Sequence, residues 1–213
     1  IKPRPEEHKM QHITPILALP LLLMTLPALA GEAPIAHMPA HAKPGDFREY
    51  NNTLMGITCS RWEFTEVTDA GEVLNQCGDK TMVLSTDFDL NPMRISDGTG
   101  TTLVEFKPFY PQLSYPLTLG KEWSGEYSGY TADNDAHWDS KVNCKVEAFE
   151  KLQVIAGEFD TFRIACVDHW RAGLLFSGET HSTRWYAPKT FSIIKVVHDK
   201  AKWNTELVNY QIQ

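Results

Sequence analysis

Hydrophobic and polar residues alternate along most of residues 46–213, in short runs rich in Val, Ile, Thr, Phe, Tyr and Trp. This two-residue period is typical of β-strands with one buried face. Turn signals separate the runs, at Asp69-Ala70-Gly71, Asp97-Gly98 and Ala156-Gly157. The pattern predicts strands over residues 58–66, 72–77, 80–87, 92–96, 101–107, 122–131, 138–155, 159–170, 177–187, 192–198 and 202–212. We therefore predict an all-β fold, either a single antiparallel, strongly curved sheet or a partly open β-barrel, with short turns and two intrachain disulfides.

The stretch WSGEYSG, residues 123–129, contains a serine next to a glycine and raises the question of a catalytic turn. A nucleophile elbow has the order Gly, any, Ser, any, Gly, but Ser128 comes one position too late. Alternation along a strand instead places Trp123 and Tyr127 on one face and Ser128 on the other. We predict that Ser128 is a solvent-side strand residue and not a nucleophile.

Four cysteines allow three disulfide pairings, and strand register selects one of them. If Cys144 lies opposite Cys166 in an antiparallel pair, apolar residues meet across the strands. The facing residues would be Val146 with Ile164, and Ala148 with Phe162.

The second predicted disulfide joins Cys59 to Cys77. In the same register Trp62 lies opposite Leu74, and both cysteines occupy the more polar face, away from Trp62. A zinc site made of the four thiolates is the alternative, but it would need closely spaced CxxC pairs, which the sequence lacks.

The N-terminus has the order of a secretory signal peptide. The apolar run ITPILALPLLLMTL is followed by small residues that predict cleavage after Ala30. A membrane anchor is less consistent with the sequence because Pro15 and Pro20 interrupt the run. We predict a signal peptide over residues 1–30, with residues 1–9 as upstream sequence or a basic start to the signal.

Residues 31–45 are rich in Ala and Pro and predict a flexible leader, followed by an all-β domain over residues 46–213. His37 and His41 stand four apart in this leader, but Pro39 argues against a helix that would hold a metal between them. No membrane-spanning segment is expected after removal of the signal.

The formal net charge is −7, from 20 Lys and Arg against 27 Asp and Glu, with no basic run. Nucleic acid binding needs a concentration of positive charge, so we expect no nucleic acid partner. An exported location also agrees with an even number of cysteines.

Three motifs in the second half resemble a known family of exported bacterial β-proteins, those with a domain of unknown function of the 3108 type. They are YPLTLGKEWSGEYSG, VIAGEFDTFRI and RWYAPKTFSIIKV, in this order. The sequence departs from the family pattern at Thr190 and Phe191, where a glycine turn is expected, so this hairpin is predicted to be longer. The resemblance implies a β-rich protein of the Gram-negative periplasm, or a secreted one, and implies no catalytic residue.

Several polar clusters suggest chemistry, and each also has a structural explanation. The acidic segment 133–139 lacks the glycine and final Glu that an EF-hand needs, so we interpret it as a solvated loop. The glycine run 97–102 lacks the lysine of a phosphate-binding loop and predicts a hairpin turn. Histidines on different strands, with neighbouring carboxylates, could form a zinc site or a hydrolytic triad: His169, His181 and His198, with Asp168, Glu179 and Asp199.

Two hypotheses for function follow. The first is a non-catalytic exported protein, without cofactor or metal, that binds an apolar small molecule or a protein or other component of the cell envelope in the concavity of the sheet. Its candidate ligand-binding residues are Trp123, Tyr127, Trp185, Tyr186 and His181. The second is a secreted hydrolase or metal-dependent enzyme that uses the strand histidines. We favour the first, and oligomeric state is left open.

Overall fold

The structure is a computed structural model that describes residues 33–39, 42–52 and 56–213. The predicted signal peptide, its cleavage site after Ala30, and His41 lie outside these residues. The described residues belong to one compact unit, Glu32–Gln213. Its strands are β1 (Ile35–Ala36), β2 (Phe47–Tyr50), β3 (Arg61–Val67), β4 (Glu72–Cys77), β5 (Lys80–Ser85), β6 (Asn91–Ser96), β7 (Thr102–Lys107), β8 (Leu117–Thr118), β9 (Glu122–Thr131), β10 (Ala136–Val154), β11 (Gly157–Ala172), β12 (Phe176–Ala187), β13 (Ser192–His198) and β14 (Thr205–Gln211). Three short 3₁₀ helices complete the described elements: η1 (Thr86–Phe88), η2 (Pro188–Thr190) and η3 (Ala201–Trp203).

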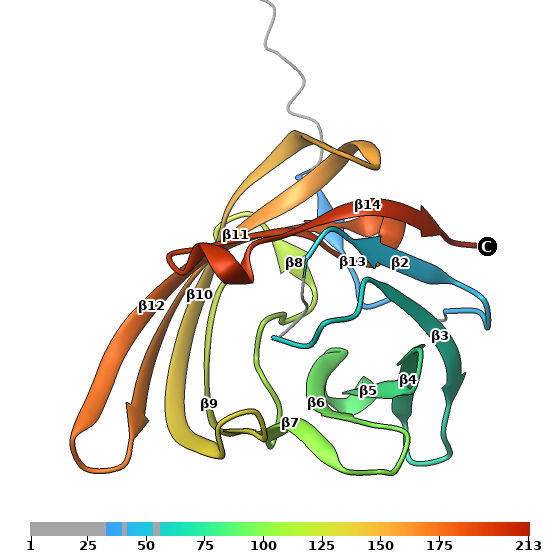
Figure 1. Cartoon of the computed structure of the whole chain (residues 1–213). Helices are drawn as coiled ribbons and strands as arrows, with labels where there is room; N and C mark the ends of the chain where they lie inside the picture. Colours follow the sequence, from blue (N-terminus) through green and yellow to red (C-terminus); the bar gives the residue numbers. More distant parts are fainter. Residues whose placement is uncertain (1–32, 40–41, 53–55) are drawn as a thin grey trace, which may run out of the picture. The chain divides into compact units, whose positions relative to one another are not determined.

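Twelve of the strands form a closed antiparallel barrel (Figure 1). Their order is β10-β11-β12-β13-β14-β2-β3-β4-β5-β6-β7-β9, and β9 closes the ring because it pairs with both β7 and β10. The predicted all-β antiparallel fold is confirmed. The sheet is closed, so it has no long exposed edge on which another chain could add a strand.

The long hairpin of β10 and β11 has the predicted disulfide register at its centre. Cys144 lies opposite Cys166 and forms a disulfide with it, with a Cα–Cα distance of 4.1 Å. Val146 lies opposite Ile164, also as predicted. Beyond this point a β-bulge at Glu147 shifts the register by one residue. The predicted pairing of Ala148 with Phe162 is therefore wrong: Ala148 lies opposite Arg163, and Phe149 opposite Phe162.

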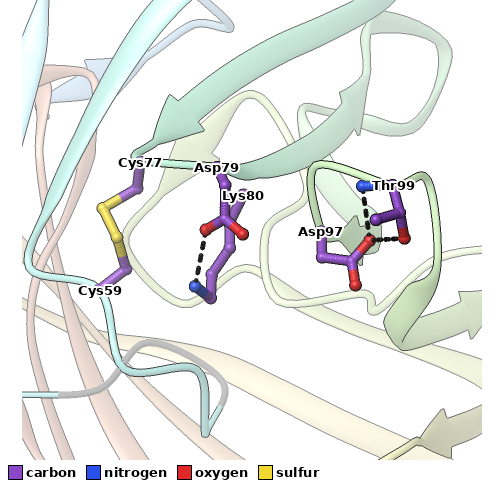
Figure 2. Close-up of polar contacts among 6 residues, drawn as sticks. All are labelled: Cys59, Cys77, Asp79, Lys80, Asp97 and Thr99. Atoms are coloured by element: carbon purple, nitrogen blue, oxygen red, sulfur yellow. Dashed lines mark hydrogen bonds and ion pairs between the residues drawn. A yellow bond between two sulfur atoms is a disulfide. The ribbon is translucent and has the colours of Figure 1, made fainter.

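The Cys59–Cys77 disulfide is present (Figure 2), but the register predicted around it is wrong. Trp62 does not lie opposite Leu74, which instead pairs with Glu66 after a bulge in β3. Cys59 lies before the first residue of β3, so its disulfide with Cys77 forms outside the ladder between β3 and β4. The bridge also does not lie on a polar face, because Cys77 is buried in the same cluster as Trp62 and Cys59 packs against that cluster.

The predicted flexible leader is wrong for two of its residues. Ile35 and Ala36 form β1, which pairs with β8 in a small separate sheet and places Ala36 opposite Leu117. Both of these side chains are buried, which gives the segment a packing partner that its composition does not reveal. Strands β2 and β8 were likewise not among the predicted runs, because each is only a few residues long.

The hairpin between β12 and β13 is lengthened where the sequence departs from the family pattern. Helix η2 occupies residues Pro188–Thr190, and Phe191 follows with a φ of 52°, in the left-handed region. Arg48 Nε donates a hydrogen bond of 2.8 Å to the Thr190 carbonyl and connects this turn to β2.

The segment between β7 and β8, residues 108–116, packs against the inner face of the sheet. Its peptide bonds Lys107–Pro108 and Tyr115–Pro116 are cis. Pro111 lies so close to Gly125 of β9 that a Cβ there would be 2.6 Å from the proline ring. The Trp123 indole donates a hydrogen bond of 3.1 Å to the Pro111 carbonyl. The interior is therefore occupied by the chain itself, and we call residues 108–116 the interior segment.

Asn91 of β6 holds the interior segment by three hydrogen bonds. Its side-chain oxygen accepts from the backbone N–H groups of Gln112 and Leu113 at 3.0 and 2.9 Å. Its side-chain nitrogen donates to the Leu113 carbonyl at 2.8 Å. Asn91 is itself buried, so these bonds satisfy backbone groups that water does not reach.

The substitution Asn91→Ala is expected to destabilise the protein by roughly 3 kcal/mol, because it leaves buried backbone groups of the interior segment without partners. Urea unfolding of the exported chain would measure the loss. Asn143→Ala on the exposed face of β10 is the matched control and is expected to change the free energy of unfolding by less than about 0.5 kcal/mol. Equal effects of the two substitutions would contradict the role of Asn91.

Each disulfide closes a loop of similar length, with sequence separations of 18 and 22 residues. Replacing either pair by alanines is expected to cost about 3 kcal/mol in the chain-entropy model. The Cys144/Cys166 variant should lose more than the Cys59/Cys77 variant, because the guanidinium of Arg184 contacts both sulfurs of the former bridge. Urea unfolding of both variants checks the order, and a larger loss from the Cys59/Cys77 variant would contradict it.

Candidate functional site

A cluster of polar side chains lies on the inner face of strands β9 to β11. Asp168 of β11 accepts a hydrogen bond of 2.6 Å from the hydroxyl of Tyr127 on β9. Its other carboxylate oxygen accepts a hydrogen bond from Ser140 of β10. Tyr127 and Ser140 are directly opposite in the ladder and both are buried. The strand register thus places two hydroxyl donors next to one carboxylate.

Arg184 of β12 extends this inner cluster. It is only 3 % exposed, and its guanidinium donates hydrogen bonds to the Tyr110 hydroxyl and to the Cys166 sulfur, the latter at 3.2 Å. Among the described residues it has no ion-pair partner, so a hydroxyl, a disulfide and the Tyr110 ring surround a buried positive charge. The rings of Tyr110 and Tyr127 are 5.2 Å apart and connect Arg184 to Asp168. We call Tyr110, Tyr127, Ser140, Asp168 and Arg184 the inner polar cluster.

Five buried tyrosines have raised pKa values. Burial is the largest cause in each case, because it disfavours the charged phenolate. For Tyr127, the neighbouring Tyr110 and the Asp168 carboxylate raise the pKa further. The phenols are therefore neutral at physiological pH. The five are Tyr50, Tyr110, Tyr115, Tyr127 and Tyr186.

A hollow of about 820 Å³ lies over strands β9 to β12. Most of its lining side chains are exposed and carry charge or a hydroxyl, so it is polar and open to solvent. We call it the strand hollow. Its lining residues are Lys107, Glu126, Tyr127, Ser128, Asp139, Ser140, Lys141, His169, Trp170, Arg171, Ser177, Gly178 and Glu179.

Ladder register arranges the charges of the strand hollow in pairs. Lys141 lies 3.6 Å from Glu126, and Ser128 donates a hydrogen bond of 2.7 Å to Asp139. Ser128 is exposed and lies in β9, as predicted. Arg171 lies directly opposite Asp139 in the ladder between β10 and β11. Among the described residues, however, its guanidinium has no ion-pair partner. The strand hollow therefore contains a guanidinium that is available to a ligand.

The structure brings two of the three predicted strand histidines together. His169 Nδ1 lies 3.0 Å from one oxygen of Glu179, and His181 Nε2 lies 2.7 Å from the other. His198 instead contacts Asp199, and burial lowers its pKa. Asp168 faces the inner cluster and is separated from His169 by the alternation of the strand. Within the described ranges, no group of three or more His, Cys, Asp or Glu side chains has an arrangement that could hold a metal ion.

The candidate ligand-binding residues are not brought to one cavity. Trp123 and Tyr186 belong to the cluster around the Cys144–Cys166 bridge, whereas Tyr127 and Trp185 belong to the larger cluster that contains Trp62. The Trp185 indole donates a hydrogen bond of 2.9 Å to Glu150. His181 lies on the exposed face. Only Tyr127 lines the strand hollow.

The remaining motifs have structural roles in the turns. The glycine run 97–102 is the hairpin turn between β6 and β7, as predicted. Asp97 accepts hydrogen bonds from the backbone N–H and hydroxyl of Thr99 (Figure 2), and these bonds lower the pKa of Asp97. In the acidic segment, His137 lies 3.8 Å from Asp135, and both side chains are exposed.

Sequence reasoning did not identify the inner polar cluster, because Tyr110 comes from an irregular segment and Arg184 looked like an ordinary strand cation. One signal was present. Arg184 and Tyr186 are two residues apart on a strand, so their side chains point to the same face, and a large aromatic residue on that face favours burial. Both residues are indeed buried.

No family model matches the chain, and no curated protein matches it. Two crystal structures are similar to it. One is described as a "putative lipoprotein" from Parabacteroides distasonis and has a TM-score of 0.45 and 12% sequence identity to this chain. The other is described as a "putative exported protein with YmcC-like fold" from Bacteroides fragilis and has a TM-score of 0.46 and 13% sequence identity. Each comparison covers 83% of this chain and 99% of the other. Membership of the family of the 3108 type stays a prediction.

Alkaline pH is expected to destabilise the fold through the five buried tyrosines. Their pKa values are raised in the folded state, so their contribution is fully present below about 10, the pKa of an unfolded tyrosine, and is lost as the pH rises further. Tyrosinate absorbance and far-ultraviolet circular dichroism should therefore change together in one cooperative step. Tyr127→Phe should make the pH dependence shallower. Ionisation of all tyrosines before unfolding would contradict this prediction.

Proposed function

We propose that this chain is an exported, non-catalytic binding protein of the bacterial cell envelope, and that it binds a polar envelope component in the strand hollow. The export signal predicted over residues 1–30 and the two disulfides support an oxidising compartment outside the cytoplasm. The observation that carries the binding site is the strand hollow itself, in which Arg171 has no ion-pair partner within the described part of the chain.

We infer a polar ligand because the interior of the barrel is already filled by the chain. The interior segment and the aromatic core fill the space in which an apolar ligand was expected. The strand hollow offers carboxylates at Asp139 and Glu179 and a guanidinium at Arg171. A guanidinium recognises carboxylate or phosphate groups with paired hydrogen bonds, and the flanking carboxylates can accept from hydroxyls. A hydroxyl-bearing, anionic envelope component fits this set.

A hydrolytic role has less support from the contacts. A serine nucleophile needs an imidazole that accepts its proton. Ser140 donates instead to Asp168, and the imidazoles of His169 and His181 both contact Glu179 on the exposed face. These interactions are consistent with structural and binding roles for the same residues.

Native mass spectrometry of the chain exported to a bacterial periplasm tests the proposal. The wild type is expected to carry an extra mass that is lost on denaturation. In Arg171→Ala, the fraction of molecules that carry this mass is expected to fall at least tenfold. Arg61→Ala, which removes an exposed arginine of β3, is the matched control and should retain the mass. A wild type without bound mass, or an equal mass on Arg171→Ala, would contradict binding in the strand hollow.

A further inference from the structure

The turn between β11 and β12 exposes three consecutive large apolar side chains. Leu174 is 101% exposed, Leu175 88% and Phe176 69%. Among the other large apolar residues of the described chain, the most exposed is Ile155 at 63%, and it stands alone in its turn. The turn lies at the end of the hairpin of β11 and β12, drawn in orange at the lower left of Figure 1. We call Leu174, Leu175 and Phe176 the apolar tip.

Folding does not require this composition. Gly173, with a φ of 65°, supplies the left-handed residue that the turn needs, and the positions beside it are free to be polar, as turn residues usually are. The apolar tip contributes to neither hydrophobic cluster. A contiguous apolar patch that plays no part in the core usually marks a binding surface.

Aromatic and cationic side chains lie behind the apolar tip. Trp170 and Arg171 precede Leu174 by four and three residues, which places them roughly 10–13 Å back along the strand. Lys200 Nζ lies 5.8 Å from the Trp170 ring centroid and 4.9 Å from that of Trp203. An apolar end followed by tryptophans and basic residues is the order found in proteins that insert into the headgroup region of a bilayer.

We propose that the apolar tip docks on a phospholipid bilayer, with Leu174, Leu175 and Phe176 inserted among the acyl chains and Arg171 and Lys200 at the phosphate groups. Three side chains cover far less than the roughly 800 Å² that each partner buries in a stable protein interface. A bilayer needs no complementary surface of that size. Because the whole chain has a net charge of −7, apolar insertion and not long-range attraction drives the contact.

Co-sedimentation with vesicles of phosphatidylethanolamine and phosphatidylglycerol tests this proposal on the exported, processed chain. The wild type is expected to bind, and the triple variant L174S/L175S/F176S is expected to bind at least tenfold more weakly. Raising the salt concentration should weaken the wild type only a few-fold. The double variant L119S/I155S removes exposed apolar residues from other turns and should bind like the wild type.

The triple variant should unfold at the same urea concentration as the wild type, because the apolar tip lies outside the core. A wild type that does not sediment with vesicles, or a triple variant that binds as well as the wild type, would overturn the proposal. Sedimentation velocity without lipid covers the remaining alternative: a dimer that the triple variant abolishes would assign the apolar tip to self-association and overturn lipid docking. The test does not depend on a ligand in the strand hollow.

Discussion

The need to fill a twelve-stranded barrel controls most of this structure. A barrel of eight strands has an interior that side chains alone can fill, and the diameter grows with strand number. Here the interior segment supplies the additional atoms. A non-strand segment inside a barrel brings backbone polar groups away from water, and each of them then needs a partner. Asn91 provides three such partners at once. Gly125 is part of the same solution, because a Cβ there would collide with Pro111.

The filled interior also decides where binding can occur. A barrel that binds a ligand inside, as lipocalins do, needs unoccupied space in its interior. In this chain, Tyr110 and Leu113 of the interior segment pack into the two hydrophobic clusters and occupy that space. Two surfaces of the described chain that a partner can reach are the exposed face of β9 to β12 and the β11–β12 turn. These two surfaces differ in chemistry, since the strand hollow is polar and the β11–β12 turn is apolar. Arg171 connects the two surfaces, because it lines the strand hollow and also lies three residues before the apolar tip.

The inner polar cluster shows how a buried charge is accommodated without an ion pair. Arg184 has hydroxyl and sulfur acceptors, and the Asp168 carboxylate has two hydroxyl donors. Tyr110 and Tyr127, in ring contact with each other, lie between the two charges. Each charge therefore has its own neutral hydrogen-bond partners, and removing one of these partners would leave a buried donor or acceptor unsatisfied. The cluster thus favours a single arrangement of strands β9 to β12 around the Cys144–Cys166 bridge.

The alternation of residues was enough to predict most of the strands, their antiparallel hairpins, the exposed position of Ser128 and the Cys144–Cys166 disulfide with its register. The Cys59–Cys77 disulfide is also present, although the register from which it was predicted is wrong. These features depend on side-chain period and on neighbouring segments, which are local properties. Closure of the barrel, the interior segment and the pairing of β1 with β8 depend on contacts between residues far apart in the chain, and no local pattern encodes them. The bulge at Glu147 shows the same limit, because one extra residue in a ladder reverses the register without altering the alternation. Tertiary structure alone decided which polar residues became buried, since burial is set by what packs on a face and not by the residues that form it.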